Sequence, residues 1–262
     1  MEIVIVDDEP VSLAVLKQLV GKLPDCKARA FAHASAALAW CDSNDPDVVI
    51  VDYMMPGLNG IEFTRRLRAV EGRSDTPLLM VTANAEVKVR DSALESGIND
   101  FLSKPFDSTD LQARVSNMLA LRFSQQKRAN RISSRDTVAR GVTGETVQRD
   151  HNQLLDYDLT LARLGGDAAL LGDIARIFMR TVPQLLISIR DALDQNDLER
   201  VYIESHSLKG AVGSVEAPAV LKAVLDLETH ARNDEANAAA AAFADADTVI
   251  QRLSTELAAL VS

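Results

Sequence analysis

Three aspartates directly follow apolar runs near the start of the chain. Asp7 and Asp8 come after residues 3–6, and Asp52 comes after residues 48–51. If both runs are strands of one parallel sheet, the three carboxylates converge at its carboxyl edge and repel one another unless a cation offsets them. An all-oxygen site of this kind favours Mg²⁺, which also pairs with phosphate oxygens.

Two further chemical groups follow later apolar runs. Thr82 comes after residues 78–81, and Lys104 comes shortly after residues 100–102. A lysine beside a magnesium ion neutralises phosphoryl oxygens while a carboxylate attacks in line, so the set fits phosphoryl transfer. Taken singly, an aspartate pair can cap a helix, a threonine can be structural and a Lys-Pro pair can form a turn. The order and spacing of all these residues together favour a shared site.

His206 is the candidate nucleophile of the second half. On a helix, His206, Lys209, Gly210 and Gly213 share one face, because they stand at positions i, i+3, i+4 and i+7. Two glycines inside a helix cost about 1 kcal/mol each relative to alanine, which suggests that something bulky approaches the imidazole closely. Lys209 can stabilise an added phosphate. The alternative is a helix–helix contact with a satisfied histidine, the interpretation given to the other three histidines.

The first 122 residues alternate short apolar runs with amphipathic segments. Five repeats of this kind predict a doubly wound α/β fold, in which helices cover both faces of a five-stranded parallel sheet. Ligands of such sheets lie at the carboxyl ends of the strands. The predicted strands are residues 3–6, 28–31, 48–51, 78–81 and 100–102, and helical stripes cover residues 11–23, 61–70 and 111–119.

From residue 152 onward the pattern is helical and no strand is indicated. Four long amphipathic segments joined by short turns predict a separate all-α domain, a four-helix bundle at 152–262. Pro183 should kink or break the first of these helices. Residues 123–151 lack an apolar stripe, so we expect a linker whose first residues extend the preceding helix. The predicted helices cover residues 167–193, 198–212, 217–231 and 235–260.

The composition limits the classes of function. The formal net charge is −10, and the only basic block, residues 123–150, is short, so no nucleic acid or membrane partner is expected. Cys26 and Cys41 do not have the spacing of a metal-binding cysteine motif, so we expect both to be reduced thiols. No apolar run is long enough to span a bilayer, and Met1 leads into a strand and not into a signal peptide, so we expect a cytoplasmic protein.

Residues 1 to about 122 resemble the receiver domain of two-component response regulators, a flavodoxin-like fold. The resemblance implies that Asp52 is the phosphorylated carboxylate and that Lys104 binds the phosphoryl group. The motifs that carry it are Val6-Asp7-Asp8-Glu9, Val51-Asp52-Tyr53-Met54-Met55-Pro56-Gly57-Leu58-Asn59-Gly60, Val81-Thr82-Ala83 and Ser103-Lys104-Pro105-Phe106.

The same resemblance implies a cofactor and a switch. Mg²⁺ would be held by Asp7, Asp8 and Asp52, with the backbone carbonyl of Met54 as a further ligand. Thr82 would move toward the phosphoryl group after transfer, and Phe101 would change its rotamer with it. The peptide bond between Lys104 and Pro105 would be cis.

Residues from about 152 to 260 resemble a histidine phosphotransfer (HPt) domain. The segment His206-Ser207-Leu208-Lys209-Gly210, followed by small residues, fits the family motif His-x-Leu-Lys-Gly. The resemblance implies that His206 carries phosphate and that Gly210 and Gly213 lie on the face that docks a receiver. Glu216 departs from the small residue expected near there, which bears on the identity of the partner.

Together the two halves predict a phosphorelay protein. It would accept a phosphoryl group on Asp52 and carry or pass one through His206, with a sensor histidine kinase of the hybrid kind as donor and a downstream receiver as recipient. No Gly-x-x-x-x-Gly-Lys-Ser/Thr loop is present, so we expect only self-catalysed phosphorylation and dephosphorylation of Asp52 and no kinase activity. Alternatively, phosphorylation of the receiver gates docking to the HPt face without direct transfer. The oligomeric state stays open.

Two other classes of function fit less well. A DNA-binding transcription factor is supported only by the basic segment at residues 123–150, without a helix-turn-helix pattern. A haloacid-type phosphatase needs a second aspartate two residues after its nucleophile, and the chain has Met54 at that position.

Overall fold

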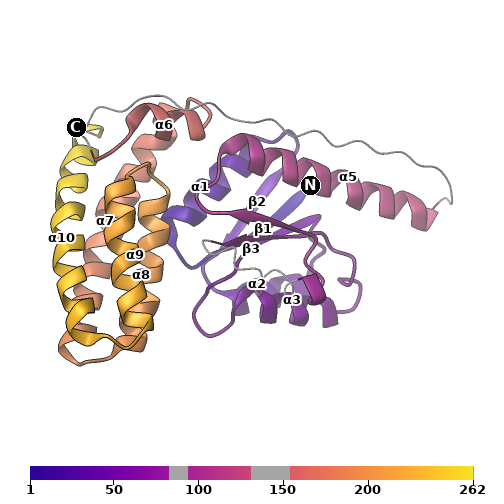
Figure 1. The fold of residues 1–262 in the computed structure, drawn as a ribbon. Coiled ribbons are helices and arrows are strands. Elements are labelled where there is room, and N and C mark those ends of the chain that lie inside the picture. The colour runs from indigo at the N-terminus through magenta and orange to yellow at the C-terminus, as the bar shows by residue number, and fades with distance from the viewer. Residues whose placement is uncertain (83–93, 131–153, 262) are drawn as a thin grey trace.

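The computed structural model describes residues 1–82, 94–130 and 154–261. Figure 1 shows a sheet with its flanking helices on one side of the molecule and a bundle of long helices on the other. Helix α1 (Pro10–Gly21) lies between these two parts. We call them the sheet domain and the bundle.

Five parallel strands form the sheet, in the order β2-β1-β3-β4-β5. This is the order of flavodoxin-like doubly wound sheets, so the predicted fold class of the first half is confirmed. Each predicted strand ends within one residue of the observed one, because continuous Val/Ile-rich runs suit strands buried on both faces. The strands are β1 (Glu2–Val6), β2 (Lys27–Phe31), β3 (Val48–Asp52), β4 (Leu78–Thr82) and β5 (Asp100–Ser103).

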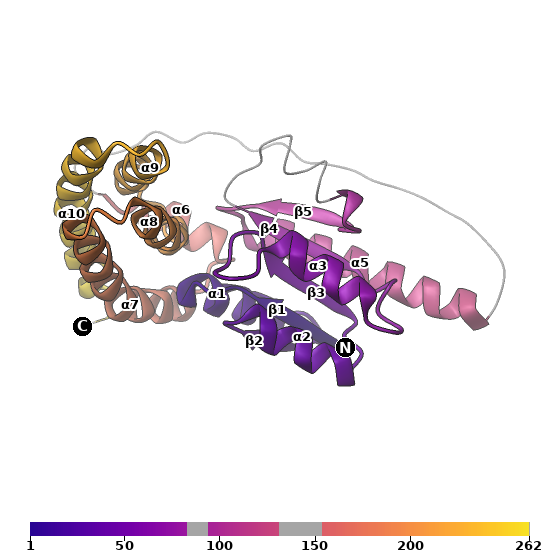
Figure 2. The same ribbon diagram turned by 90° about the horizontal axis from the view of Figure 1, so that it is seen from below.

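Alternate residues of each strand face opposite layers of helices. Ile3 and Ile5 of β1 join the apolar cluster of α1 and α5, whereas Val4 and Val6 join that of α2 and α3. Figures 1 and 2 show the two layers on opposite faces of the sheet. Because both faces are covered, ligands can reach the central strands only at their ends. The helices are α2 (Ala34–Ser43), α3 (Gly60–Ala69) and α5 (Ser108–Asn130).

The described residues of the second half form helices only. Four long helices contact one another in sequence, and α7 also contacts α10, which closes the predicted four-helix bundle. A short helix precedes them in a segment for which the sequence predicts none; Asp156 caps it by accepting a hydrogen bond from the Leu159 amide. The helices are α6 (Tyr157–Arg163), α7 (Ala168–Asp194), α8 (Leu198–Gly213), α9 (Pro218–Arg232) and α10 (Ala236–Ala259).

Helix α7 runs through Pro183, where the sequence predicts a kink or a break. A break at Pro183 is therefore wrong, although proline removes one backbone hydrogen bond from a helix, and a kink there stays a prediction. Residues on both sides of the proline, including Phe178, Val182 and Leu186, are buried in the bundle. Packing of this apolar face keeps the helix continuous, since tertiary contacts supply most of a helix's stability.

One apolar cluster continues from the sheet domain into the bundle. Leu16 and Leu19 of α1 belong to the same buried cluster as Leu164 and Leu170 of the bundle. Helix α1 contacts both α7 and α8, and the views in Figures 1 and 2 agree on this arrangement. The two parts of the protein therefore share a buried interface.

The remaining expectations concern cysteines, membranes and the linker. Cys26 and Cys41 are free thiols, and burial raises the pKa of Cys41 to about 11. In the part of the chain that the structure describes, no helix combines the length and the apolar character needed to cross a bilayer. Helix α5 continues to Asn130, and the rest of the predicted linker lies outside the described residues. The domain boundaries stay predictions.

Candidate phosphotransfer site

The carboxyl ends of β1 and β3 place Asp7 and Asp52 side by side. The two strands are neighbours in the sheet with Val6 opposite Val51, so the residues that follow reach the same edge. Both aspartates are buried, Asp7 with 0% and Asp52 with 5% of its surface exposed. The Ser12 hydroxyl donates to Asp7 at 2.6 Å, which fixes the direction of that carboxylate.

The segment after β3 requires a glycine at position 60. A Cβ atom on Gly60 would lie 2.5 Å from the carbonyl oxygen of Asp52 and 3.0 Å from the Cα of Tyr53. The preceding residue, Asn59, caps α3 and forms a capping box with Glu62. Glycine therefore lets α3 begin directly against the strand that ends in Asp52.

Lys104 connects the two buried carboxylates. Its Nζ lies 2.7 Å from Asp7 Oδ2 and 2.7 Å from Asp52 Oδ1. Burial by itself would lower the pKa of Lys104, but the attraction of Asp52 and Asp7 outweighs burial and raises the pKa above its usual range. The bond between Lys104 and Pro105 is cis, as the resemblance to receivers implies.

Negative charge exceeds positive charge around this lysine. Burial and the charges of Asp7 and Asp52 raise the pKa of Asp8 to about 7. Burial and Asp7 raise the pKa of Glu9 to about 8, and burial also raises the pKa of Asp52. These four acids share a single pocket with one lysine, so the site is short of positive charge and its donors suit a divalent cation.

The predicted magnesium ligands Asp7, Asp8, Asp52 and Met54 all line this pocket. Within residues 1–82, 94–130 and 154–261, however, no three acidic, histidine or cysteine side chains stand in a ready-made metal-binding group. Two of the carboxylates instead bind Lys104. The residues fit Mg²⁺ by their chemistry, since all of them offer oxygen atoms.

In the bundle, Glu228 of α9 orients His206 of α8. The Nδ1 atom of His206 lies 2.6 Å from Glu228 Oε1. Burial would raise the pKa of Glu228, but hydrogen bonds from His206 and Lys209 outweigh burial and lower it, so this carboxyl is ionised at neutral pH. An ionised carboxylate accepts hydrogen bonds only, which assigns the proton to Nδ1 and leaves the Nε2 lone pair as the nucleophile.

Lys209 binds the same carboxylate as His206. Its Nζ donates to both oxygens of Glu228 at 2.7 Å, so its charge balances the glutamate. Glu228 is the functional residue that the sequence interpretation missed. A signal was present, because Glu228 stands on the buried stripe of α9 beside Val224 and Leu227, where a charged residue needs a partner.

The acidic pocket and the imidazole face each other. A small pocket at the contact between the two parts is lined by residues of both. Only 13% of the His206 side chain is exposed, because it lies against the sheet domain. The lining residues are Asp7, Asp8, Glu9, Asp52, Met54, Lys104, His206, Ser207 and Gly210.

Gly210 permits this close approach. A Cβ atom on Gly210 would lie 3.2 Å from Glu9 Cγ, whereas one on Gly213 would meet nothing within 4 Å. Glu9 has little freedom to yield, because its carboxylate caps α1 and accepts from the Val11 and Ser12 amides at 2.9 and 2.5 Å. Of the two glycines predicted to lie on the docking face, Gly210 is the one in tight contact.

Family models match both parts of the chain. The response regulator receiver domain matches residues 3–116, and the Hpt domain matches residues 173–262. The DNA-binding response regulator MtrA of Mycolicibacterium smegmatis is 35% identical over 164 residues, which cover 61% of this chain and 69% of MtrA. This chain belongs to the response regulators with a receiver domain, and it also carries an Hpt domain.

Other relatives are larger than this chain. The cyclic di-GMP phosphodiesterase response regulator RpfG of Xanthomonas campestris pv. campestris is 32% identical over 190 residues, 72% of this chain and 50% of RpfG. The sensor histidine kinase GacS of Pseudomonas protegens is 29% identical over 254 residues, 96% of this chain and 26% of GacS. The chain thus spans half or less of these two relatives, and the match to GacS extends over both the receiver and the HPt domain.

The predicted switch residues of the receiver lie near its contact with the HPt domain. Thr82 is buried at the end of β4, and Phe101 pairs with Met80 across β4 and β5. Thr82 and Phe101 line one hollow with Phe106 of the receiver and Arg163 of α6. The residue after Thr82 in the receiver motif, at position 83, lies outside the described residues.

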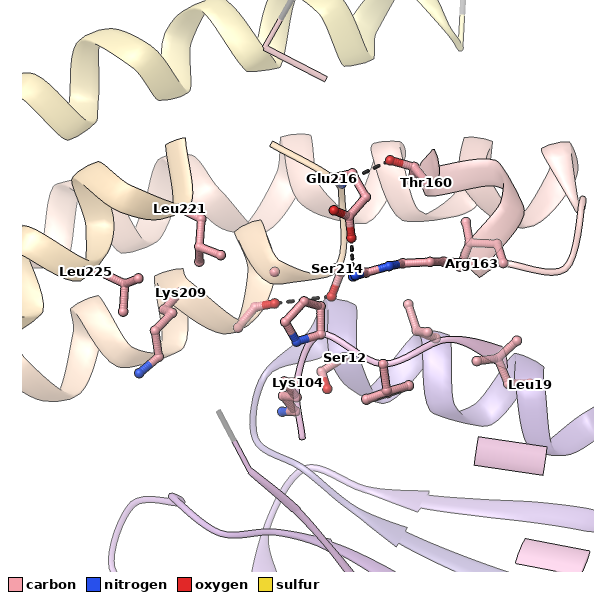
Figure 3. Close-up of a pocket in the computed structure, with 16 residues that line it drawn as sticks. Ser12, Leu19, Lys104, Thr160, Arg163, Lys209, Ser214, Glu216, Leu221 and Leu225 are labelled. Atoms are coloured by element: carbon pink, nitrogen blue, oxygen red, sulfur yellow. Dashed lines mark hydrogen bonds and ion pairs between the residues drawn. The ribbon is translucent and has the colours of Figure 1, made fainter. Parts of the chain in front are cut away.

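Glu216 anchors α6 to the HPt bundle. Its side chain forms an ion pair with Arg163, and its amide donates to the Thr160 hydroxyl at 2.9 Å (Figure 3). The Glu216 carbonyl accepts from the Asp156 amide at 2.7 Å. The residue that departs from the HPt pattern thus fixes a short helix beside the receiver.

Proposed function

We propose that this protein is a phosphorelay component of a two-component system, with Asp52 and His206 as its two phosphorylation sites. One observation carries the proposal: the carboxylate of the receiver and the imidazole of the HPt domain line the same small pocket. A pocket that serves a single phosphorylation site would need only one of these two groups. We infer that the phosphoryl group passes directly between them.

The shared pocket supports direct transfer from Asp52 to His206. Nε2 of His206 attacks the phosphorus, and the bond from phosphorus to the Asp52 oxygen breaks, so the carboxylate leaves with its electron pair. Lys104, already bound to Asp52, follows the phosphoryl oxygens and neutralises them. Glu228 keeps the Nδ1 proton and balances the positive charge that develops on the ring. The reverse reaction uses the same groups.

The proposed cofactor is Mg²⁺. Asp7, Asp8, Asp52 and the carbonyl of Met54 would hold the ion beside Lys104. When bound, it would neutralise phosphoryl oxygens that the lysine does not reach. Burial, together with the charges of Asp7 and Asp52, raises the pKa of Asp8, and a cation at this cluster of carboxylates would offset that charge, which supports the assignment.

The proposed external partners are a sensor histidine kinase, of the hybrid kind, and a separate downstream receiver. The kinase supplies the phosphoryl group, and the downstream receiver accepts it from His206. Incubation with ATP and Mg²⁺ alone should give no phosphoprotein. Robust self-labelling would show that the chain has a kinase activity of its own and overturn this assignment.

A gate is the second candidate function. His206 is 13% exposed in its contact with the receiver, so an outside partner reaches it only after the two domains separate. Phosphorylation of Asp52 could control that separation without donating its phosphate. In that case the receiver regulates the HPt domain but does not exchange its phosphoryl group with His206.

Phosphate transfer from acetyl phosphate separates the two candidates. Acetyl phosphate loads receiver carboxylates, and alkali then distinguishes stable phosphohistidine from labile aspartyl phosphate. The full-length protein should acquire phosphohistidine, and both Asp52→Ala and His206→Gln should abolish it. If Asp52→Ala still forms phosphohistidine at the normal rate, direct transfer from Asp52 is wrong.

A further inference from the structure

A second contact joins the domains away from the transfer pocket. Lys22 Nζ lies 2.9 Å from Asp167 Oδ2 and 3.5 Å from the carbonyl oxygen of Leu164. Lys22 caps the carboxyl end of α1, and Asp167 caps the amino end of α7. We call Lys22 and Asp167 the distal ion pair.

The distal ion pair and the transfer pocket lie at opposite ends of α1. Glu9, which meets Gly210, precedes the first residue of α1, and Lys22 follows the last. A contact at each end of α1 places two separated constraints on how the bundle lies against the receiver.

A cavity of about 220 Å³ separates the two contacts. Figure 3 shows Ser12 and Leu19 of α1 below it, and Lys209 and Leu221 of the bundle above. Because the middle of the interface is hollow, it contributes less dispersion attraction than a filled core would. The contacts at the two ends therefore add to the apolar packing of α1 against the bundle in aligning the domains.

We propose that Lys22 and Asp167 are positioning residues that make the HPt domain of the same chain the phosphotransfer partner of its receiver. This inference rests on the proposed function. The charges are complementary, one on each domain, and the nearby residues Leu19, Leu164 and Leu170 belong to one buried cluster. A foreign HPt domain without an acid at this place would lose the contact.

Exchange within one chain gains from the covalent connection. A tether raises the effective concentration of one domain around the other to about millimolar when the docking faces can meet. The described contacts show that the faces do meet. At micromolar protein, transfer within the chain should therefore exceed transfer between chains by about a thousandfold.

The first experiment distinguishes exchange within a chain from exchange between chains. Full-length protein is loaded with acetyl phosphate and Mg²⁺, and the rate of phosphohistidine formation is measured at several protein concentrations. The comparison is an equimolar mixture of Asp52→Ala and His206→Gln chains, in which transfer occurs only between molecules. We expect the wild-type rate to be independent of concentration and the mixture to be far slower. Equal rates would overturn the inference.

The second experiment tests the distal ion pair. Lys22→Glu should slow transfer within the chain several-fold, because it replaces attraction by repulsion at a pair whose side chains are 35% and 32% exposed. Lys22→Arg should restore most of the rate. Lys27→Glu is the matched control, since it reverses the charge of another exposed lysine of the receiver, on β2, and should leave the rate unchanged.

A double-mutant cycle tests whether the effect of Lys22→Glu depends on the charge of Asp167. Asp167→Asn removes the charge but keeps the helix cap, because asparagine caps as well as aspartate. In that background Lys22→Glu should have little further effect. If Lys22→Glu slows transfer equally with aspartate or asparagine at position 167, or not at all, the positioning role is wrong. If wild type loads Asp52 but forms no phosphohistidine, the proposed function fails before the distal ion pair is tested.

Discussion

The Nδ1 atom of His206 lies 2.6 Å from a carboxylate oxygen of Glu228, a residue 22 positions farther along the chain on the next helix. Lys209 donates to both oxygens of the same carboxylate. The two helices thus share one charge-balanced group, and the imidazole presents Nε2 to the receiver. The reactivity of His206 therefore depends on α9 as well as on its own helix.

Glu228→Gln should slow phosphorylation of His206 by about tenfold to a hundredfold, since a hydrogen bond to a charged group is worth about 1.5–3 kcal/mol. Phosphohistidine formation from acetyl phosphate-loaded receiver measures the effect. Glu235→Gln is a matched control, because Glu235 makes the same contact with Nδ1 of the exposed His230 at 2.5 Å. Equal effects of the two substitutions would contradict a specific role for Glu228.

Glu228 should also give the bundle a pH-dependent stability. Its pKa lies below the ordinary 4.5 in the folded protein, because hydrogen bonds from His206 and Lys209 outweigh the effect of burial. The stabilisation is therefore fully present above about pH 4.5 and is lost as pH falls through the lower folded value. In urea unfolding at neutral pH, the free energy of unfolding of wild type should exceed that of Glu228→Gln by about 2 kcal/mol. The gap should stay constant down to about pH 5 and then shrink; a gap that widens in acid would contradict the assignment.

Asp8→Asn should stabilise the metal-free receiver and weaken its response to Mg²⁺. Burial, Asp7 and Asp52 raise the pKa of Asp8 from 3.8 to about 7, so the destabilisation by Asp8 grows as pH rises from 3.8 and is complete above about pH 7. Thermal unfolding at about pH 8, with and without MgCl₂, measures both effects. Adding MgCl₂ should raise the melting temperature of wild type. Without the salt the variant should melt at a higher temperature than wild type, and the salt should raise its melting temperature less. Asp42→Asn, at an exposed carboxylate of α2, should change neither value.

Gly210→Ala should slow transfer between the domains, whereas Gly213→Ala should not. Both changes favour the helix by about 1 kcal/mol, so stability alone predicts the same result for each. Only the Cβ at position 210 approaches Glu9, at 3.2 Å from its Cγ. Comparing phosphohistidine formation in the two variants isolates the contact. Similar rates for both would mean that Glu9 yields and that the approach is not limiting.

The strands and long helices could be predicted because their patterns have one physical interpretation. Residues 48–51 and 78–81 are apolar without interruption and fully buried in β3 and β4. Helix α6 escaped prediction because it has only 7 residues and little apolar periodicity. The unbroken course of α7 escaped it because local rules for Pro183 do not include packing in the bundle.

The site could be predicted in part. Asp7, Asp52 and Lys104 lie at strand ends, and the topology of a parallel sheet brings such residues together. The partners of His206 and Lys22 come from other elements of the chain, and periodicity identifies which face of a helix is buried but not what covers it. These contacts therefore could not be predicted from the sequence alone.

The buried apolar cluster that runs from the sheet through Leu19 into Leu164 and Leu170 has a thermodynamic consequence. Two domains joined by such a surface cannot melt independently, because unfolding of either domain exposes the apolar interface of the other domain to water. An ion that binds only at the strand ends should therefore raise the melting temperature of helices that it never touches. Calorimetry would register the whole molecule as a single cooperative transition.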